Sequence, residues 1–173
     1  MSVMFKSPSI KTIRIPSTLT EIEDGGLASP MIEGFTMTSP NPIYDIRNNS
    51  LVETATDILV AGGTASSIIH ESVTSIGNCA FMQSNIATVD LHENITSIGD
   101  RAFYYAYPST VISRSVTPPT LGTECFWIAR YNGVLKVPEE GLTAYREQWM
   151  INELGYLGWS TAKWGLYALA EDE

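Results

Sequence analysis

Basic residues and long apolar runs are both scarce in this sequence. Only 10 lysine and arginine residues stand against 19 aspartate and glutamate residues in 173, which gives a net charge of −9 at neutral pH. The basic residues are scattered singly, whereas phosphate binding needs clustered positive charge, so neither nucleic acid nor an anionic membrane surface is expected as a partner. No apolar run approaches the ~18–20 residues that span a bilayer, so no membrane insertion is expected.

Cysteine and recognisable targeting or catalytic motifs are scarce as well. Two cysteines cannot form a disulfide framework. The first ten residues, MSVMFKSPSI, lack the apolar stretch of a secretory signal, so no export signal of that type is predicted. The sequence contains no G-x-S-x-G, H-E-x-x-H, Walker, Rossmann or C-x-x-C motif, so we predict that the chain is not an enzyme and needs no cofactor.

The main pattern in the sequence is an internal repeat. Residues 73–81, VTSIGNCAF, recur 22 positions later as residues 95–103, ITSIGDRAF, and six of the nine residues are identical. A degraded earlier copy reads LTEIEDGGL at residues 19–27, and a later copy with one inserted residue ends at Phe126. Short alternating apolar segments precede the copies and predict strands of about four residues, marked by Ile13 and Ile15, by Ile69, and by Val89 and Leu91. One such unit cannot bury its apolar edge alone, so the units are expected to stack into a continuous core.

Stacking predicts which side chains share an interior column. The aliphatic column takes one residue from each copy: Ile22, Ile76, Ile98 and Leu121. The second column is mostly aromatic: Leu27, Phe81, Phe103 and Phe126. Gly77 and Gly99 are expected where the chain needs a positive φ to turn a corner. Cys79 and Cys125 fall two units apart, roughly 10 Å by strand spacing and beyond disulfide reach, so we predict two free thiols.

Two segments depart from the repeat. The copies that begin at residues 19 and 73 are separated by much more than one repeat, and the excess is too long for a plain loop. We predict that an insert at about 28–62 forms a β-hairpin or a three-stranded flap that protrudes from the edge of a solenoid spanning residues 1–138. After Pro138, apolar residues spaced three and four apart (Leu142, Tyr145 and Trp149) predict a helix over residues 139–153. With an aromatic tail at 154–170, this C-terminal region, residues 139–173, would seal the last unit.

These segments together resemble the BspA-like (Treponema pallidum-type) leucine-rich repeat family. The resemblance covers roughly residues 10–149 and rests on five segments: VTSIGNCAF, ITSIGDRAF, NPIYDIRNNSLVETATDILVAGG, TPPTLGTECF and LKVPEEGLTAYREQW. It implies a mainly β, right-handed leucine-rich-repeat solenoid of about four coils, with an inserted β-hairpin and a C-terminal helix and aromatic cap. It also implies a cell-surface or secreted bacterial protein tied to adhesion or protein binding, without catalytic residues. The repeats of that family usually carry a cysteine three residues after the phenylalanine, where Ser84 and Ala106 stand here.

The histidines give one candidate site. His70 and His92 occupy the same position in successive copies of the repeat, and Glu71 and Glu93 follow them, so stacking would bring two imidazoles and two carboxylates together as ligands for a divalent metal. The alternative is a solvated turn that repetition alone has stacked. We favour the turn, because no further groups that would orient the imidazoles are evident.

Aromatic residues after the phenylalanine column give the stronger candidate. Five of them are expected along one edge of the stack: Tyr104, Tyr105, Tyr107, Trp127 and Tyr131. A contiguous exposed aromatic patch marks an interaction surface, although we favour the alternative that Tyr104 and Trp127 simply pack beneath the C-terminal cap. The sequence therefore predicts a non-enzymatic, protein-binding or adhesin-like module with a protein or glycan partner. The alternative is a self-associating structural component of an assembly such as a phage particle.

Overall fold

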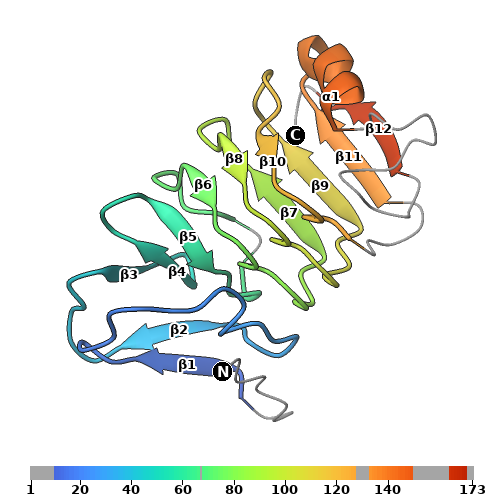
Figure 1. Ribbon diagram of the computed structural model, residues 1–173. Coiled ribbons are helices and arrows are strands. Elements are labelled where there is room, and N and C mark those ends of the chain that lie inside the picture. The colour runs from blue at the N-terminus through green and yellow to red at the C-terminus, as the bar shows by residue number, and fades with distance from the viewer. Residues whose placement is uncertain (1–9, 67, 128–132, 150–163, 171–173) are drawn as a thin grey trace.

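The computed structural model describes residues 10–66, 68–127, 133–149 and 164–170, and these are mainly β with one short C-terminal helix. Strands β1 (Thr12–Ile15) and β2 (Gly34–Met37) form a two-stranded parallel sheet at the N-terminal end. The other described strands form a six-stranded and a four-stranded sheet, which run side by side up to the helix at the opposite end (Figure 1).

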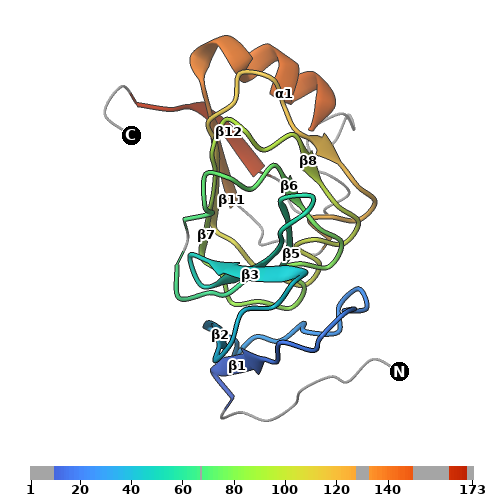
Figure 2. The ribbon, with the colours of Figure 1, turned by 90° about the vertical axis from the view of Figure 1, so that its left-hand side faces the viewer.

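The predicted repeats stack in parallel. The T-S-I segments form the short strands β6 (Ser75–Ile76) and β8 (Ser97–Ile98), and β10 (Thr120–Leu121) pairs next to β8. The pairing aligns Ile76 with Ile98 and Ile98 with Leu121, which confirms that part of the predicted aliphatic column. Viewed from the side, successive turns of the chain overlie one another, with β7 on one side of the interior and β6 and β8 on the other (Figure 2). The handedness of the stack and the number of about four coils stay predictions.

The opposite wall is the four-stranded parallel sheet, in the order β12-β11-β9-β7. Its strands are β7 (Thr88–Leu91), β9 (Thr110–Ser113), β11 (Gly133–Val137) and β12 (Trp164–Ala168). The register aligns Val89 with Val111 and Val111 with Leu135, and all three side chains are fully buried. Alternation along each strand therefore turns one aliphatic row inward, as a half-buried strand requires.

Phenylalanine rings fill the turn between the two walls. The Phe81 and Phe103 rings stack with centroids 5.1 Å apart and planes 7° apart, and the Phe103 and Phe126 rings stack at 5.0 Å and 3°. Backbone bonds hold this spacing, since the amides of Phe81 and Phe103 donate to the carbonyls of Ala102 and Cys125, both at 2.7 Å. The aromatic column predicted from the repeat is confirmed for these three rings.

The first copy of the repeat does not enter the columns, which corrects the prediction for Ile22 and Leu27. Both side chains are only partly buried and pack against a separate N-terminal core. Leu59 of β5 (Ile58–Ala61) pairs with Ile76 and occupies the place predicted for Ile22. The place beside β6 is thus taken by a strand of the insert. The later copies also differ from the first in having a glycine, Gly77 or Gly99, where the first copy has Glu23.

These glycines act through close approach and not through their own φ. The structure contradicts a positive φ at Gly77 and Gly99, because the left-handed residues lie two positions later, at Cys79 (φ 55°) and Arg101 (φ 54°). A Cβ on Gly99 would lie 2.5 Å from Asn78 Oδ1 and 2.7 Å from the Asn78 amide nitrogen of the preceding unit. Glycine is thus required where successive units touch backbone to backbone, and a side chain there blocks stacking.

The insert also differs from the prediction, because it does not protrude. Strand β2 pairs with β1, while β3 (Tyr44–Arg47), β4 (Ser50–Glu53) and β5 form an antiparallel meander. The meander joins the repeat stack through parallel pairing of β5 with β6 and extends the same sheet to six strands. This arrangement covers the edge of β6, which would otherwise be an open edge strand.

The C-terminal region closes the stack. A 3₁₀ turn (Glu139–Gly141) leads into helix α1 (Leu142–Gln148), and Tyr145 and Trp149 are buried as the spacing predicted. The rings of Trp149 and of Trp164 in β12 lie 6.0 Å and 6.4 Å from the Phe126 ring, at the end of the aromatic column. The tail is thus in part a strand, parallel to β11, while the predicted helix beyond Trp149 lies outside the described residues.

Candidate interaction surface

The structure separates the five predicted aromatic residues into exposed and packed groups. Tyr105 and Tyr107 keep 38% and 42% of their surface exposed, whereas Tyr104 and Trp127 are partly buried. The Tyr104 ring meets the Tyr105 ring edge to face, with centroids 4.7 Å apart, and the Arg101 guanidinium lies 5.8 Å from the centroid of the Tyr104 ring. Tyr131 lies outside the described residues. Two tyrosines, backed by a third, therefore form the accessible part of the predicted edge.

A shallow groove lies beside the two exposed tyrosines. Its volume is about 290 Å³, and it is lined by Pro30, Gln83, Asn85, Tyr105 and Tyr107. Asn85 Nδ2 donates to the carbonyl of Pro30 at 2.9 Å and so fixes the N-terminal side of the groove. A second hollow of about 230 Å³ adjoins Tyr107 and is lined also by Asn85, Ile86, Ala87 and Ser109. Rings and amides around a concave surface suit the recognition of another polypeptide.

The sequence carried a signal for two of these groove residues. Gln83 and Asn85 occupy the repeat positions of Tyr105 and Tyr107 in the preceding unit. Gln83 and Tyr105 also share a left-handed backbone, with φ of 60° and 54°. Pro30 had no such signal, because the first copy leaves the columns.

The contacts among the described residues give little support to the alternative that these tyrosines pack beneath the C-terminal cap. The side chains of the cap reach other groups, as Tyr145 Oη lies 2.6 Å from Ser113 Oγ and Trp149 Nε1 donates to the Pro119 carbonyl at 2.8 Å. Their ring contacts within the described part of the chain go to Phe126 and to each other. Tyr105 and Tyr107 are left facing solvent.

The histidine column is a hydrogen-bonded turn in the structure. His92 Nε2 lies 3.1 Å from the carbonyl of His70, and His92 Nδ1 accepts from the amide of Asn94 at 3.3 Å. Both ring nitrogens of His92 thus have protein partners, as has His70 Nδ1, which accepts from the amide of Ser72. Among the described residues, which include Glu71 and Glu93, no group of three or more histidine, cysteine or acidic side chains is placed to hold a metal ion. The contacts therefore support the stacked turn over the metal site.

Both cysteines are free, as predicted from their separation in the stack. Cys79 is half-buried, whereas Cys125 is fully buried and occupies the interior position that alanine holds in the two preceding units. Burial raises the pKa of the Cys125 thiol from 9.0 to about 12. Since the folded state keeps this proton more tightly than the unfolded chain, the thiol should make stability depend on alkaline pH.

We expect the free energy of unfolding to fall by about 1 kcal/mol per pH unit above the unfolded-state thiol pKa of about 9. The loss begins at that value because the unfolded thiol then ionises, while the buried thiol stays protonated up to about pH 12. Urea unfolding at about pH 8 and about pH 10 measures it. Cys125→Ala, which restores the alanine of the other units, should lower this pH dependence, and an unchanged dependence would contradict the assignment to Cys125.

Comparison with known protein families agrees with the fold. A family model described as the BspA type leucine rich repeat region (6 copies) matches residues 63–145, which run from the end of the insert through most of helix α1. No curated protein sequence matches the chain. Within the described residues, none of the helical structure is long and apolar enough for a bilayer span.

The matched region contains strands β6 to β11 and the three phenylalanines of the aromatic column. Leucine-rich repeats suggest a protein-interaction module, because stacked repeats expose extended, rigid surfaces. Residues 63–145 of this chain are therefore a leucine-rich repeat region of the BspA type.

Proposed function

We propose that this chain is a non-enzymatic, adhesin-like binding module that contacts a partner protein through the groove beside Tyr105 and Tyr107. One observation carries the proposal: the exposed rings of Tyr105 and Tyr107, two residues apart in one repeat unit, line a concave surface together with Gln83 and Asn85 of the preceding unit. Tyrosine is enriched among residues that dominate binding energy, because its ring buries a large area and its hydroxyl still finds a partner. Display on a bacterial surface is part of the proposal.

The rigidity of the groove supports this role. Gln83 and Tyr105 are fixed by the ladder, since their amides donate to the carbonyls of Tyr104 and Trp127 at 2.8 Å and 3.2 Å. A preformed surface loses little conformational entropy on binding, so more of the contact energy appears as affinity.

The test compares capture of surface-protein and glycan partners by the immobilised wild type and by a Tyr105→Ala/Tyr107→Ala variant. We expect recovery of the bound protein to fall about tenfold or more, because each truncated hot-spot tyrosine removes on the order of 1–2 kcal/mol. Tyr167→Ala is the matched control, since Tyr167 is 56% exposed on β12 at the C-terminal end of the stack. Equal recovery of every partner by all three proteins would contradict the proposal, and capture of glycans alone would replace the protein partner.

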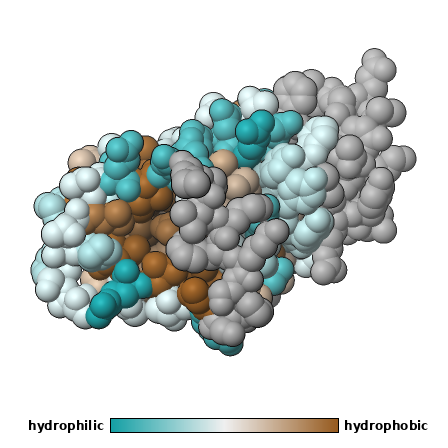
Figure 3. Space-filling view, turned by 60° about the horizontal axis from the view of Figure 1, so that its bottom comes forward, coloured by the Kyte–Doolittle hydropathy of each residue, from teal (hydrophilic) through white to brown (hydrophobic). Residues whose placement is uncertain are grey.

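A second candidate is a structural role in an assembly, and one observation favours it. Apolar side chains gather on the face of the N-terminal end that is turned toward the viewer in Figure 3. Partly buried hydrophobics of the N-terminal core belong to this end: Ile13, Leu19, Ile22, Leu27, Met37 and Ile43. Apolar patches of this kind mark association surfaces. Size-exclusion chromatography with light scattering tests the role, because a monomer at every concentration would contradict it.

A further inference from the structure

The groove beside Tyr105 and Tyr107 continues into the neighbouring hollow. Asn85 and Tyr107 line both, so the hollow of about 290 Å³ and the hollow of about 230 Å³ meet at these two side chains. We call the two hollows together the tyrosine channel. A ligand that fills the whole channel must be extended, because it has to pass Tyr107 to reach from one hollow into the other.

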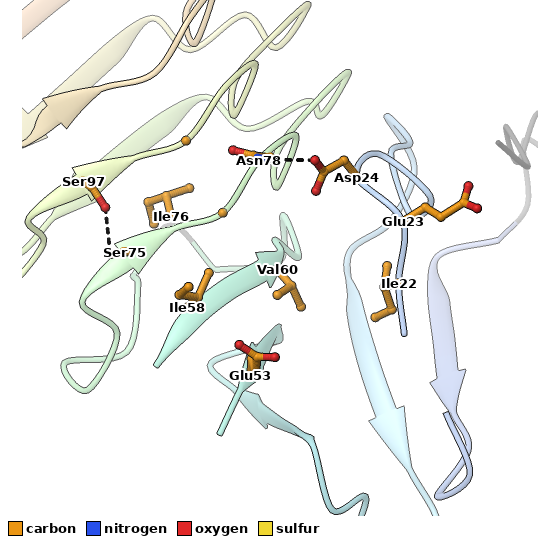
Figure 4. Close-up of a pocket in the computed structure, with 12 residues that line it drawn as sticks. Ile22, Glu23, Asp24, Glu53, Ile58, Val60, Ser75, Ile76, Asn78 and Ser97 are labelled. Carbon is orange, nitrogen blue, oxygen red and sulfur yellow. Dashed lines mark hydrogen bonds between the residues drawn. The ribbon is translucent and has the colours of Figure 1, made fainter. Parts of the chain in front are cut away.

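The lining of the tyrosine channel is uncharged. Neither hollow has an aspartate, glutamate, lysine, arginine or histidine among the described residues that line it. The groove lined by Ile22 and Val60, beside β5 and β6, differs in this respect, because three acidic residues also line it (Figure 4). Placing an unpaired charge against an uncharged lining costs free energy, so the tyrosine channel favours a neutral ligand.

Two backbone acceptors around the channel are already bonded within the protein. The carbonyl of Pro30 accepts from Asn85 Nδ2 at 2.9 Å. The carbonyl of Ala87 accepts from the amide of Ser109 at 2.9 Å and from its hydroxyl at 3.2 Å. A ligand that has to donate many N–H groups therefore finds fewer acceptors here than the backbone alone would offer.

Two side chains of the channel can still donate. Within the described part of the chain, neither the side-chain amide of Gln83 nor the hydroxyl of Tyr107 has a hydrogen-bond partner, and Tyr107 is 42% exposed. A ligand with free carbonyl groups therefore suits the lining.

We propose that the tyrosine channel binds a neutral, proline-rich segment of the partner protein in the polyproline II conformation. Such a segment has no internal hydrogen bonds, and its prolines have no N–H, so it presents carbonyls and apolar rings together. Its prolines pack on the rings of Tyr105 and Tyr107, while Tyr107 and Gln83 donate to its carbonyls. Residues three apart in this conformation lie about 9 Å apart, so successive turns occupy the two hollows. The inference rests on the proposed function, because it names the partner segment for the same groove.

An extended β-strand segment fits the channel less well. Its N–H groups need acceptors, and the carbonyls of Pro30 and Ala87 are already bonded. A proline-rich segment also loses less conformational entropy on binding, because the φ angle of proline is fixed before the contact forms.

Fluorescence polarisation with a short, labelled, neutral peptide of alanine and proline tests the inference. The wild type should bind the peptide with an affinity that salt changes little, because no charged groups contribute. A peptide of the same length in which glycine replaces proline does not hold the polyproline II conformation, and it should bind about fivefold more weakly or less.

Variants of Tyr107 separate the ring from its hydroxyl. Tyr107→Ala should weaken binding of the proline peptide about tenfold or more, because it removes both. Tyr107→Phe keeps the ring and removes the donor, and it should weaken binding about threefold to fivefold. Tyr167→Ala, at an exposed tyrosine on β12, is the control and should leave binding within about twofold. Circular dichroism confirms that the variants fold.

Four results would overturn the inference: no binding of the proline peptide to the wild type, equal binding of the glycine peptide, equal weakening by Tyr107→Ala and Tyr167→Ala, or unchanged binding by Tyr107→Phe. The capture experiment with Tyr105→Ala/Tyr107→Ala keeps the two proposals apart. If that variant loses partner proteins while the wild type ignores the proline peptide, only the choice of a proline-rich segment is wrong. If the variant captures every partner as the wild type does, the proposed function is wrong as well.

Discussion

Replacing Phe103 with alanine is expected to lower the free energy of unfolding by about 3–5 kcal/mol. Phe103 is fully buried at the middle of the aromatic column, and its ring stacks on Phe81 at 5.1 Å and on Phe126 at 5.0 Å. Truncation removes the transfer free energy of one large side chain and leaves a cavity that two flanking rings cannot both fill. In a repeat stack it also weakens both interfaces of one unit at once.

Urea unfolding followed by circular dichroism measures this loss. Tyr105→Ala, two residues later on the exposed edge, removes a similar area of ring and should change the free energy of unfolding by about 0.5 kcal/mol or less. A Phe103→Ala protein as stable as the Tyr105→Ala protein would contradict the stacking of the units around these rings.

Replacing Trp149 with alanine is the second change with a large expected effect, again about 3–5 kcal/mol. The side chain is 2% exposed, and its indole Nε1 donates to the Pro119 carbonyl at 2.8 Å. The same ring packs 6.0 Å from the Phe126 ring and 5.1 Å from the Tyr145 ring. Its removal exposes the end of the aromatic column, which a terminal element must cover.

Hydrogen exchange distinguishes this effect from that of Phe103→Ala. Loss of Trp149 should lower amide protection first in β10 and β11, next to the cap, and least in β5 and β6, because each unit contacts only its neighbours. Gln148→Ala, at the preceding exposed position of α1, serves as the control and should leave protection unchanged. Uniform loss of protection along the stack would argue against a terminal cap.

The repeat was predictable because identical positions in successive units bury one another. The recurrence of VTSIGNCAF as ITSIGDRAF was enough to pair Ile76 with Ile98 and Phe81 with Phe103. The C-terminal helix was predictable for the same kind of reason, since Tyr145 and Trp149 lie on one helical face and both are buried. Apolar spacing determines such contacts locally.

The N-terminal part was less predictable because two segments of the chain can compete for the same place beside β6. The first copy looked like a further unit, yet β5 of the insert pairs with β6 instead. The residues of the first copy pack on a separate N-terminal core. Which of two distant strands pairs with a given edge is not contained in residue periodicity alone.

The candidate surface was predictable in position but not in composition. Tyr105 and Tyr107 are exposed on the expected edge. Gln83 and Asn85, which line the groove with them, are found from the sequence only by taking the equivalent positions in the preceding repeat unit. The groove lined by Ile22 and Val60 had no sequence signal, because these residues come from segments that meet only after β5 has taken the place beside β6.

The parallel register of the repeat units determines how the length of the molecule depends on the number of units. One contact repeats along the stack, because Asn78 Oδ1 accepts from the backbone amide of Asp100 at 2.9 Å and Asp100 Oδ1 accepts from the backbone amide of Thr123 at 2.6 Å. Each unit therefore presents to the next the same contacts that it receives from the one before. Duplicating one whole unit would lengthen the stack by about 4.8 Å and leave both ends intact. The number of repeats therefore sets the distance between the N-terminal core and the C-terminal cap.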